Sequence, residues 1–333
     1  MKVLITGCFG FIGFNFLNYV SDKYTNDFSI VGIDSMESDC SYKNKNLYLE
    51  NENFTFFDLN INDIDKLDSK HSENIECVIN FAAETHVDNS IFMPEKFIYS
   101  NVLGVTELLK FIHKKKIKKF IHVSTDEVYG STKDYYFKED DSFNTASPYS
   151  ASKASAELIC NAFSKTYGLD ITMVRPANNY GIYQQPEKLV PFSIAKLINK
   201  EKIEIYGEGK NVRHWLNVED TCSAIIAIMN ANIENEIYNI GSGFYLENIK
   251  LAKKLIDIFD LDDSFIEFVE DRPGHDFRYA TDLTKLNNIG WKAEADFDVE
   301  LNNIVNWYKE NEQWWVTEYN KILKNRKKRL SLD

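Results

Sequence analysis

The chain has 333 residues, of which 44% are hydrophobic, and this composition excludes a wholly disordered protein. The length allows one large core or two unequal lobes. The net charge of −13 argues against a surface that binds nucleic acid or an anionic membrane. The apolar runs are too short to span a bilayer, and the first residues enter a strand pattern without room for a signal peptide. We therefore expect a cytoplasmic protein.

Five cysteines are scattered without a C-x-x-C pair and without a histidine at metal-ligand spacing: Cys8, Cys40, Cys77, Cys160 and Cys222. They predict reduced, mostly buried thiols and no metal site. Only six arginines occur, far fewer than the lysines. Four of them stand inside patterned stretches, which favours planar, forked donors over generic charge: Arg175, Arg213, Arg272 and Arg278.

A glycine-rich turn follows the first predicted strand, where Lys2–Gly7 leads into T-G-C-F-G-F-I-G and then into helical periodicity over Phe14–Tyr24. Its three glycines let the backbone approach a pyrophosphate at the helix N-terminus. Asp34 ends the second strand, Ser29–Ile33, about 20 residues later, where an acid binds the adenosine ribose and would repel a 2′-phosphate. This favours NAD over NADP. A packing turn with a solvated Asp34 is the weaker alternative.

Two further strands end in residues suited to the same dinucleotide. Phe54–Phe57 is followed by Asp58 and Leu59, a polar and an apolar residue that suit the amino group and the ring face of an adenine. Val78–Ala83 runs into A-A-E-T-H-V-D, where two small alanines would let the dinucleotide lie against the sheet edge.

Alternating strands and helices over residues 2–177 predict the α/β class, with a Rossmann-like, doubly wound parallel sheet and its ligand at the carboxyl ends of the strands. Pro94–Lys115 reads as one long helix with a solvated, lysine-rich C-terminus, and Lys119–Ser124 as the fifth strand. Two polar residues stand just before that helix. We interpret His86 as a residue whose hydrogen bonds are satisfied within the protein, without direct contact to the ligand. We interpret Asp88 as a helix cap or a local hydrogen-bond partner.

Beyond the helix Ser147–Tyr167 and the strand Asp170–Val174 the pattern loosens. Short strands alternate with a helix that ends at Asn199 and with helices over Asn217–Asn230, Leu251–Phe259 and Val299–Trp315. We predict a smaller α+β C-terminal substrate lobe. Residues 1–178 and 213–240 would form the dinucleotide-binding domain, residues 179–212 and 241–320 the lobe, and residues 321–333 a solvated basic tail.

Proton-transfer groups gather in the stretch Val123–Lys153. The run T-D-E, residues 125–127, follows the fifth strand, and Tyr149 and Lys153 stand one helical turn apart. An ammonium group close to a phenol is expected to lower the pKa of the phenol, which would make Tyr149 a base. Y-x-x-x-K alone is a common accident, and an acid pair after a strand is often only a helix N-terminus. Because the glycine turn stands upstream, a chance occurrence of these patterns is the weaker interpretation.

Eight motifs give the chain its resemblance to a known family: T-G-C-F-G-F-I-G, A-A-E-T-H-V-D, S-T-D-E-V-Y-G, Y-S-A-S-K, R-P-A-N-N-Y-G, P-E-K-L-V-P, G-K-N-V-R-H-W-L-N-V-E-D and D-R-P-G-H-D-F-R-Y. Over nearly its whole length it resembles the dTDP-glucose 4,6-dehydratase family of extended short-chain dehydrogenase/reductases. T-D-E is the specific element, because relatives that epimerise or decarboxylate lack the acid pair in this form. The resemblance implies an NAD-dependent lyase that converts a nucleoside-diphosphate glucose into its 4-keto-6-deoxy form.

The resemblance also implies what each group does. Tyr149 takes the proton of the sugar C4 hydroxyl while hydride passes from C4 to NAD+, with Thr125 donating to the C4 oxygen. Lys153 holds the nicotinamide ribose. Glu127 removes the C5 proton, and Asp126, held protonated, donates to the C6 hydroxyl so that water leaves. The hydride then returns to C6.

Binding residues follow from the same resemblance. The cofactor would contact Gly7, Gly10, Phe11, Ile12, Gly13, Asp34, Asp58, Leu59, Phe81, Ala82, Ala83, Thr85, Ser100, Ser124, Tyr149, Lys153 and Asn179. The sugar nucleotide would contact Thr85, Thr125, Asn178, Lys188, Leu189, Tyr206, Arg213, Asn248, Arg272, His275 and Tyr279. Arg175 and Arg278 are interpreted as structural salt-bridge formers.

Four places depart from the family pattern. Cys8 and Phe9 stand where Gly-Ala is usual, and Ile182 stands where proline is usual. His214 and Asn217 replace an aspartate and a tyrosine, respectively. None of these belongs to the acid–base set, but the last two put the detail of nucleotide binding in question.

The residues leave three alternatives open. The base could be thymine or uracil, because one methyl group contributes only about 1–3 kcal/mol of discrimination. A sugar-nucleotide 4-epimerase or decarboxylase on the same fold is the nearest other function, and a non-catalytic NAD-binding subunit is a more distant one. The resemblance further implies a homodimer through the helices Pro94–Lys115 and Ser147–Tyr167.

Overall fold

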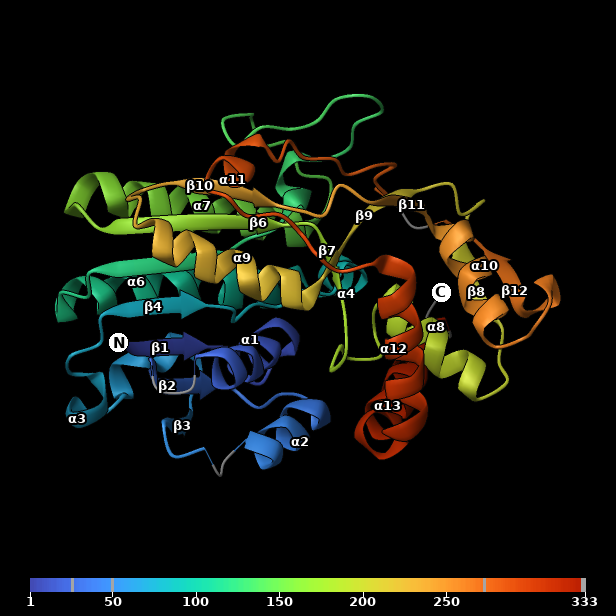
Figure 1. Ribbon diagram of the computed structural model, residues 1–333, viewed down its shortest axis with the longest axis horizontal. Coiled ribbons are helices and arrows are strands. Elements are labelled where there is room, and N and C mark those ends of the chain that lie inside the picture. Colours follow the sequence, from blue (N-terminus) through green and yellow to red (C-terminus); the bar gives the residue numbers. More distant parts are fainter. Residues whose placement is uncertain (25–26, 49–50, 272–273, 331–333) are drawn as a thin grey trace.

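A seven-stranded parallel sheet forms the centre of the computed structural model, which describes residues 1–24, 27–48, 51–271 and 274–330, with side chains as far as residue 326 (Figure 1). The strand order is β10-β6-β5-β4-β1-β2-β3. The strands are β1 (Lys2–Thr6), β2 (Ser29–Asp34), β3 (Phe54–Asp58), β4 (Cys77–Asn80), β5 (Lys119–Val123), β6 (Asp170–Pro176) and β10 (Ile237–Ile240). Every pairing in this sheet is parallel, which confirms the predicted α/β class.

Helices cover both faces of this sheet (Figure 1). They are α1 (Phe11–Lys23) and α9 (Val218–Ala231) on one face, and α6 (Gly104–Lys115) and α7 (Pro148–Tyr167) on the other. Successive residues of β1 alternate between the two cores: Val3 and Ile5 pack under α1 and α9, and Leu4 packs under α6 and α7. Because both faces are buried, the strands appear in the sequence as continuous apolar runs.

A smaller group of elements lies beyond the carboxyl ends of the strands, on the right in Figure 1. It holds the sheets β11-β9-β7 and β12-β8. Its elements are β7 (Asn178–Tyr180), α8 (Leu189–Ile198), β8 (Ile203–Tyr206), β9 (Val212–Asn217), β11 (Tyr245–Glu247), α10 (Asn248–Ile258), β12 (Ile266–Val269), α12 (Phe297–Glu310) and α13 (Glu312–Leu330). Their shared core includes Trp215, Leu255, Tyr308 and Trp315. This arrangement agrees with the predicted α+β lobe.

Short helices complete the chain: α2 (Asp39–Tyr48), α3 (Ser69–Ser72), α4 (Val87–Phe92), α5 (Pro94–Phe97) and α11 (Thr284–Asn288). The predicted helix Pro94–Lys115 is interrupted, because the residues between α5 and α6, Ile98–Leu103, form a π-helix. Within it, Asn101 accepts from the Glu84 N–H at 2.8 Å and donates to the Glu84 carbonyl at 2.9 Å and to Ser152 Oγ at 2.9 Å. The wider π turn thus ties the segment after β4 to α7.

Prediction of the last helix as Val299–Trp315 was wrong. α12 ends at Glu310, and α13 runs from Glu312 to Leu330, so most of the predicted basic tail is helical. Part of that tail is also paired, because Arg326 forms an ion pair with Glu204 at 2.9 Å. The apolar face of α13 packs into the core of the smaller lobe, which the charged end of the sequence does not reveal.

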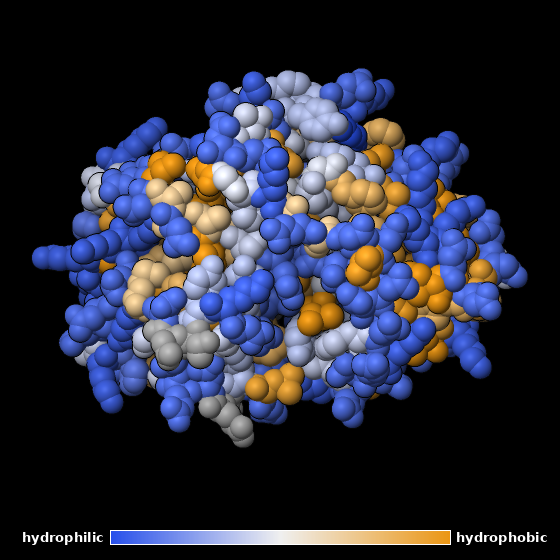
Figure 2. All heavy atoms as spheres, viewed as in Figure 1, coloured by the Kyte–Doolittle hydropathy of each residue, from blue (hydrophilic) through white to orange (hydrophobic). Residues whose placement is uncertain are grey.

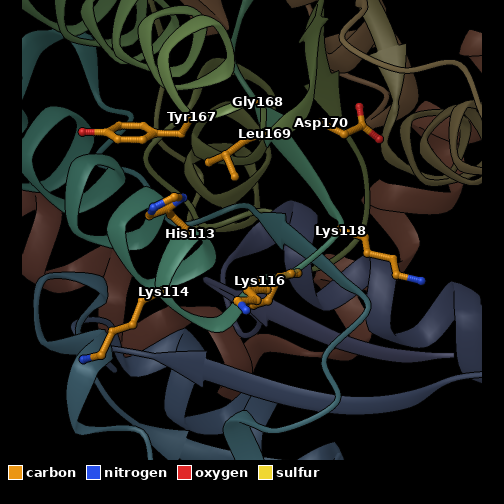
Figure 3. A pocket seen from close by; sticks show the side chains of 9 residues that line it. His113, Lys114, Lys116, Lys118, Tyr167, Gly168, Leu169 and Asp170 are labelled. Carbon is orange, nitrogen blue, oxygen red and sulfur yellow. The ribbon is translucent and has the colours of Figure 1, made fainter.

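The lysine run that ends α6 lies at the amino ends of β5 and β6, away from the predicted site. It borders a surface pocket, in which Lys114 and Lys118 point in different directions (Figure 3). Lys114 pairs with Asp65 at 3.0 Å, and Lys116 takes the left-handed conformation that ends the helix, with φ of 56°. These contacts confirm a solvated helix terminus rather than a binding patch.

The face drawn in Figure 2 carries mainly hydrophilic side chains, with scattered hydrophobic ones. All five cysteines are free and buried, as predicted. Among the described residues, no helix is both long and apolar enough to cross a membrane, and no group of three or more His, Cys, Asp or Glu could hold a metal ion.

Candidate active site

The T-D-E run leaves the carboxyl end of β5 and forms a short 3-10 helix, Asp126–Tyr129. Thr125 caps this helix, because its Oγ1 accepts from the Glu127 N–H at 3.3 Å. The acid pair therefore does occupy a helix N-terminus, as the plainer interpretation of the sequence expected. The pair also contacts a predicted substrate residue, since the Tyr279 hydroxyl lies 3.5 Å from Glu127 Oε2. A helix N-terminus alone would not require this contact.

Asp126 is only 2% exposed, and its Oδ2 atom has no hydrogen-bond partner in the described part of the chain. Burial raises the pKa of this carboxyl well above its usual value, and the neighbouring Glu127 raises it further. Arg213 opposes the shift and does not cancel it. The environment favours a neutral carboxylic acid, which is the form that donates a proton.

We expect Asp126→Asn to raise thermal stability in a pH-dependent way. Folding raises the pKa of Asp126, so the unfolded chain loses this proton at a lower pH than the folded protein does. As pH rises above about 4, the free energy of unfolding of the parent protein therefore falls. Asparagine does not titrate. The melting temperature of the variant should exceed that of the parent by about 2 °C or more at pH 8, and by less at pH 5. A variant that melts lower than the parent at both pH values would contradict the shift.

Tyr149 and Lys153 lie in the first turns of α7, which begins with a capping box at Ser147. Both side chains are buried, with exposed fractions of 7% and 3%. Lys153 Nζ donates to the Val123 carbonyl at 2.6 Å, and burial lowers the pKa of Lys153 to about 8. The helix thus brings both groups to the end of β5.

The expectation that Lys153 lowers the pKa of Tyr149 is wrong for this structure. Burial raises the pKa of the phenol, and so does the charge of Glu127, while a hydrogen bond with Thr125 opposes the shift. Lys153 directs its ammonium at the Val123 carbonyl instead. The protein side chains alone hold Tyr149 as a neutral phenol.

The glycine turn between β1 and α1 is closely packed against the start of the segment after β4. Gly7 has φ of +64°, and a Cβ atom there would lie 2.6 Å from the Ala82 nitrogen. A Cβ at Gly13 would lie 2.2 Å from the Gly7 carbonyl. Within the described part of the chain, no side chain caps α1, so its first N–H groups, including those of Phe11 and Ile12, could bind an anion.

Asp34 is 9% exposed and accepts from the N–H groups of Phe9 at 3.0 Å and Met36 at 2.9 Å. Burial raises its pKa. Its carboxylate oxygens keep lone pairs for ribose hydroxyls. Asp58, directly opposite Asp34 in the pairing of β2 with β3, is exposed, and Leu59 beside it is half-buried. These residues form one continuous edge that fits the adenosine of NAD.

The remaining predicted cofactor residues lie at the ends of β4, β5 and β7 and on the π-helical turn. Phe81 packs against Phe16 of α1, and Ser124 Oγ is buried without a hydrogen-bond partner in the described chain. Asn179 donates to the Ala177 carbonyl at 2.9 Å and accepts from Thr221 at 2.6 Å, which fixes its orientation. Ala82, Ala83 and Ser100 are half-buried, and Thr85 is exposed.

Arg213 of β9 organises the opposite side of the site. Its guanidinium stacks over the Tyr279 ring, 4.7 Å from the centroid, and its Nη2 lies 2.8 Å from His275 Nε2. Asp271 holds the other imidazole nitrogen, Nδ1, at 2.6 Å. Tyr279 donates to Asp276 at 2.7 Å. Three residues predicted from two separate motifs, Arg213 from one and His275 and Tyr279 from the other, therefore meet here and reach the acid pair through Tyr279.

Other predicted substrate residues are distributed around this group. Asn178 and Asn248 each have a buried Oδ1 atom without a partner among the described residues, as expected of groups that await a ligand. Lys188 donates to the Thr85 carbonyl at 2.5 Å, and the Tyr206 hydroxyl donates to Asp88 at 3.1 Å. Leu189 begins α8. Arg272 lies outside the described residues.

Two motif neighbours, His86 and Asp88, share the capping and hydrogen bonding around α4. His86, rather than Asp88, caps α4 by accepting from the Asn89 N–H at 3.3 Å. Asp88 accepts a hydrogen bond from Tyr206, which is far away in sequence. The interpretation of His86 as a satisfied residue is confirmed, since its Nε2 also lies 3.3 Å from the Glu187 carbonyl.

The two arginines interpreted as structural differ from each other. Arg175 forms a buried ion pair with Glu157 of α7 at 2.6 Å, as predicted. Arg278 forms no such pair with the residues that the structure describes: it donates to the Lys133 carbonyl at 3.0 Å and stacks over Tyr245. It therefore holds the loop before α7 by hydrogen bonds and stacking rather than by a salt bridge.

His214 and Asn217, the two departures within G-K-N-V-R-H-W-L-N-V-E-D, have roles in local structure. His214 is fully buried, stacks on Tyr245 at 4.4 Å and accepts from the Gly243 N–H at 2.8 Å. Burial lowers the pKa of His214 to about 3, so the imidazole is neutral. Asn217 caps α9 by accepting from the Glu219 N–H at 2.8 Å.

Sequence reasoning missed two sets of contacts around the cofactor side. Lys96 forms ion pairs with Glu37 at 2.7 Å and Glu84 at 2.6 Å, and so joins the loop after β2 to the segment after β4. Because β1 lies between those strands, this bridge crosses the glycine-turn end of the sheet. The second set links Asn44 of α2 to Trp314 of α13. Neither has a local sequence signal.

The glycine turn, the acid after β2 and the Tyr149–Lys153 pair on α7 define an extended short-chain dehydrogenase/reductase. A family model described as GDP-mannose 4,6 dehydratase matches residues 4–304. The low-salt glycan biosynthesis protein Agl12 of Haloferax volcanii is 41% identical over 308 residues, which are 92% of this chain and 98% of that protein. The dTDP-glucose 4,6-dehydratase of Streptomyces antibioticus is 36% identical over 317 residues, 95% and 94% of the two chains.

Among solved structures, DesIV, a dTDP-glucose 4,6-dehydratase of Streptomyces venezuelae with NAD bound, is similar with a TM-score of 0.90 and 35% identity. The match covers 95% of this chain and 99% of that one. The chain therefore belongs to the nucleotide-sugar 4,6-dehydratase family of extended short-chain dehydrogenase/reductases.

Proposed function

We propose that this protein is a nucleoside-diphosphate-glucose 4,6-dehydratase that uses NAD. The observation that carries the proposal is Asp126, a buried carboxyl beside Glu127 at the end of β5, whose pKa burial raises well above its usual value. An epimerase or a decarboxylase needs no proton donor for a leaving C6 hydroxyl. An acid and a base placed next to each other suit the elimination of water.

Each catalytic residue then has one task. Tyr149, which burial keeps as a neutral phenol in the free protein, has to lose its proton first, and the positive charge of bound NAD+ would favour this loss. The phenolate of Tyr149 then takes the proton from the C4 hydroxyl, and Thr125 donates to the C4 oxygen. The 4-ketone acidifies the C5 proton, which Glu127 removes, and Asp126 donates its proton to the departing C6 hydroxyl. When C6 takes up hydride, C5 regains a proton from the protonated Glu127, and the proton that Tyr149 took balances the one that Asp126 gave. Bound NAD+ supplies a hydride acceptor for C4 and, once reduced, the hydride for C6.

Residues of this chain fit that cofactor. The N–H groups at the start of α1 suit its pyrophosphate, and Asp34 suits the adenosine ribose. Lys153, one turn after Tyr149, suits the nicotinamide ribose. We propose the dinucleotide-binding domain as residues 1–178 and 213–240, and the substrate lobe as residues 179–212 and 241–320.

A direct assay tests the function and the nucleotide together. The purified protein is incubated with dTDP-glucose and with UDP-glucose, and the rates of 4-keto-6-deoxy product are compared. Relatives named dTDP-glucose 4,6-dehydratase favour the thymidine nucleotide as the better substrate. Failure to convert either nucleotide, with NAD bound, would overturn the proposal. A product of unchanged mass would favour the epimerase.

Replacing Arg213 should impair substrate binding more than chemistry. A guanidinium on a diphosphate forms charge-assisted hydrogen bonds, so we expect Arg213→Met to raise KM by about 10- to 100-fold. The turnover number at saturating substrate should change less. Steady-state kinetics measure both, and Arg278→Met, which alters stacking over Tyr245, is the matched control. A loss confined to kcat would contradict this placement of Arg213.

We also propose a homodimer and a cytoplasmic location. Large apolar side chains are exposed on the π-helical turn and on α7: Ile98, Tyr99, Leu103 and Leu158 are each 45–57% exposed. Such a surface suits contact with a second copy. The five free, buried thiols suit a reducing compartment.

A further inference from the structure

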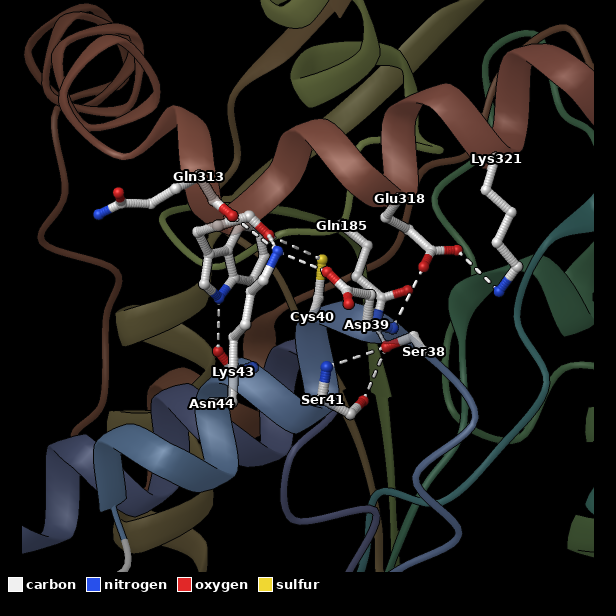
Figure 4. A network of polar contacts seen from close by, with 11 residues as sticks. Ser38, Asp39, Cys40, Ser41, Lys43, Asn44, Gln185, Gln313, Glu318 and Lys321 are labelled. Carbon is white, nitrogen blue, oxygen red and sulfur yellow. Dashed lines mark hydrogen bonds and ion pairs between the residues drawn. The ribbon is translucent and has the colours of Figure 1, made fainter.

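The last helix of the chain, α13, lies across α2, the helix that follows the loop after Asp34 (Figure 4). Lys43 of α2 donates to the carbonyl oxygens of Gln313 at 2.6 Å and Trp314 at 3.2 Å. The Asp39 N–H donates to Glu318 at 3.2 Å. These contacts attach a helix of the cofactor side to the final helix of the smaller lobe.

A buried series of hydrogen bonds continues from this contact into the glycine turn. The Trp314 indole Nε1 donates to Asn44 Oδ1 at 2.8 Å, and Asn44 Nδ2 donates to the Phe9 carbonyl at 3.0 Å. The Phe9 N–H in turn donates to Asp34 Oδ2 at 3.0 Å. The four residues are at most 9% exposed. Water cannot replace a lost bond here, so a broken link leaves a buried polar atom unpaired.

Aromatic packing joins the same two ends by a second route. Trp314 contacts Tyr183 with ring centroids 5.9 Å apart, and Tyr183 contacts Phe14 at 4.8 Å. Phe14 contacts Phe9 at 6.3 Å, and Phe9 also packs on Phe56 at 4.9 Å. The bulky Phe9, one of the departures from the family pattern, is thus the point where both routes reach the turn.

We propose that α13 sets the affinity for NAD through Trp314 and Asn44, which act as positioning residues for the glycine turn and Asp34. This proposal rests on the proposed use of NAD. When the series is intact, the Phe9 backbone is fixed from both sides, and Asp34 stays aimed at the ribose. When Trp314 no longer bonds Asn44, the turn relaxes in the free protein, and NAD must order it again on binding.

Trp314→Phe tests this directly, because it removes the Nε1 donor and keeps an aromatic ring. The dissociation constant for NAD is measured by titration calorimetry on the full-length protein freed of cofactor. We expect it to rise about fivefold to tenfold, while kcat at saturating NAD stays within twofold of the parent. Trp307→Phe is the matched control, since Trp307 packs on Trp314 at 5.1 Å outside the hydrogen-bonded series. Its dissociation constant should stay within twofold of the parent.

Equal dissociation constants for the two tryptophan variants would overturn the proposal, even if Trp314→Phe melts at a lower temperature. If Trp314→Phe does not fold, Lys43→Met decides, because it removes the ammonium that holds the Gln313 and Trp314 carbonyls. It should raise the dissociation constant about twofold to threefold, and an unchanged value would overturn the proposal. A parent protein that binds no NAD would instead overturn the proposed cofactor.

Discussion

Glu127→Gln should allow oxidation at C4 and should block every later step. Glutamine keeps the size of the side chain and the hydrogen-bonding oxygen, but it cannot accept the C5 proton. Tyr149 and the cofactor still carry out the first step, so reduced nicotinamide should accumulate. We expect the rate of product formation to fall by about 10²- to 10⁴-fold, which is the usual contribution of a general base.

Two signals measure this result in heavy water. The absorbance of reduced nicotinamide reports the first step, and mass spectrometry of the recovered sugar nucleotide reports deuterium at C5. The variant should show the absorbance and no deuterium at C5. Glu267→Gln, at an exposed acid of β12, is the control and should match the parent protein. Deuterium exchange as fast as in the parent would show that another group removes the C5 proton.

Asp126→Asn should stop the reaction one step later. The amide fills the same space but cannot donate a proton to the C6 hydroxyl, and hydroxide is a poor leaving group. Burial and Glu127 raise the pKa of this carboxyl well above its usual value, which favours the protonated donor in the parent protein. We expect a loss of about 10²- to 10⁴-fold in product formation. Removal of the C5 proton by Glu127 should continue.

The two variants therefore form a matched pair. In heavy water, Asp126→Asn should incorporate deuterium at C5 of the recovered sugar nucleotide and release no 6-deoxy product. The expected rise in melting temperature of this variant separates lost chemistry from lost folding. Blocked exchange in Asp126→Asn, like that in Glu127→Gln, would contradict the division of tasks between the two acids.

Much of the fold could be predicted because its pattern is local. Strands buried on both faces appear as short apolar runs, and the glycine turn marks where β1 passes into α1. The interruption of the predicted helix Pro94–Lys115 could not be predicted. Its π-helical turn is accompanied by bonds from Asn101 to Glu84 and Ser152, which lie 17 and 51 residues away. The helix α13 was missed because its charged end hides an apolar face that packs on distant elements.

The candidate site was predicted as a set of strand ends, and the structure brings most of that set together. Topology explains this, because the carboxyl ends of parallel strands share one edge. The protonation states of the site residues could not be predicted from their spacing in the sequence. Lys153 stands one turn from Tyr149, but it bonds the Val123 carbonyl, and burial decides the direction in which the pKa of Tyr149 moves.

Contacts between residues that are far apart in the sequence could not be predicted either. His214 and Asn217 were expected to bear on the nucleotide, and instead they hold a loop and cap a helix. The bond between Trp314 and Asn44 joins residues 270 positions apart. Pairs of this kind depend on tertiary packing, which no short motif encodes.

Internal return of the hydride is the central claim, and one labelled substrate tests it. The protein is incubated with dTDP-glucose that carries deuterium at C4, and the product is examined by mass spectrometry and proton magnetic resonance. The account predicts a product lighter than the substrate by one water, with the deuterium at C6. A product that has lost no water, or one whose C6 carries no deuterium, would contradict it.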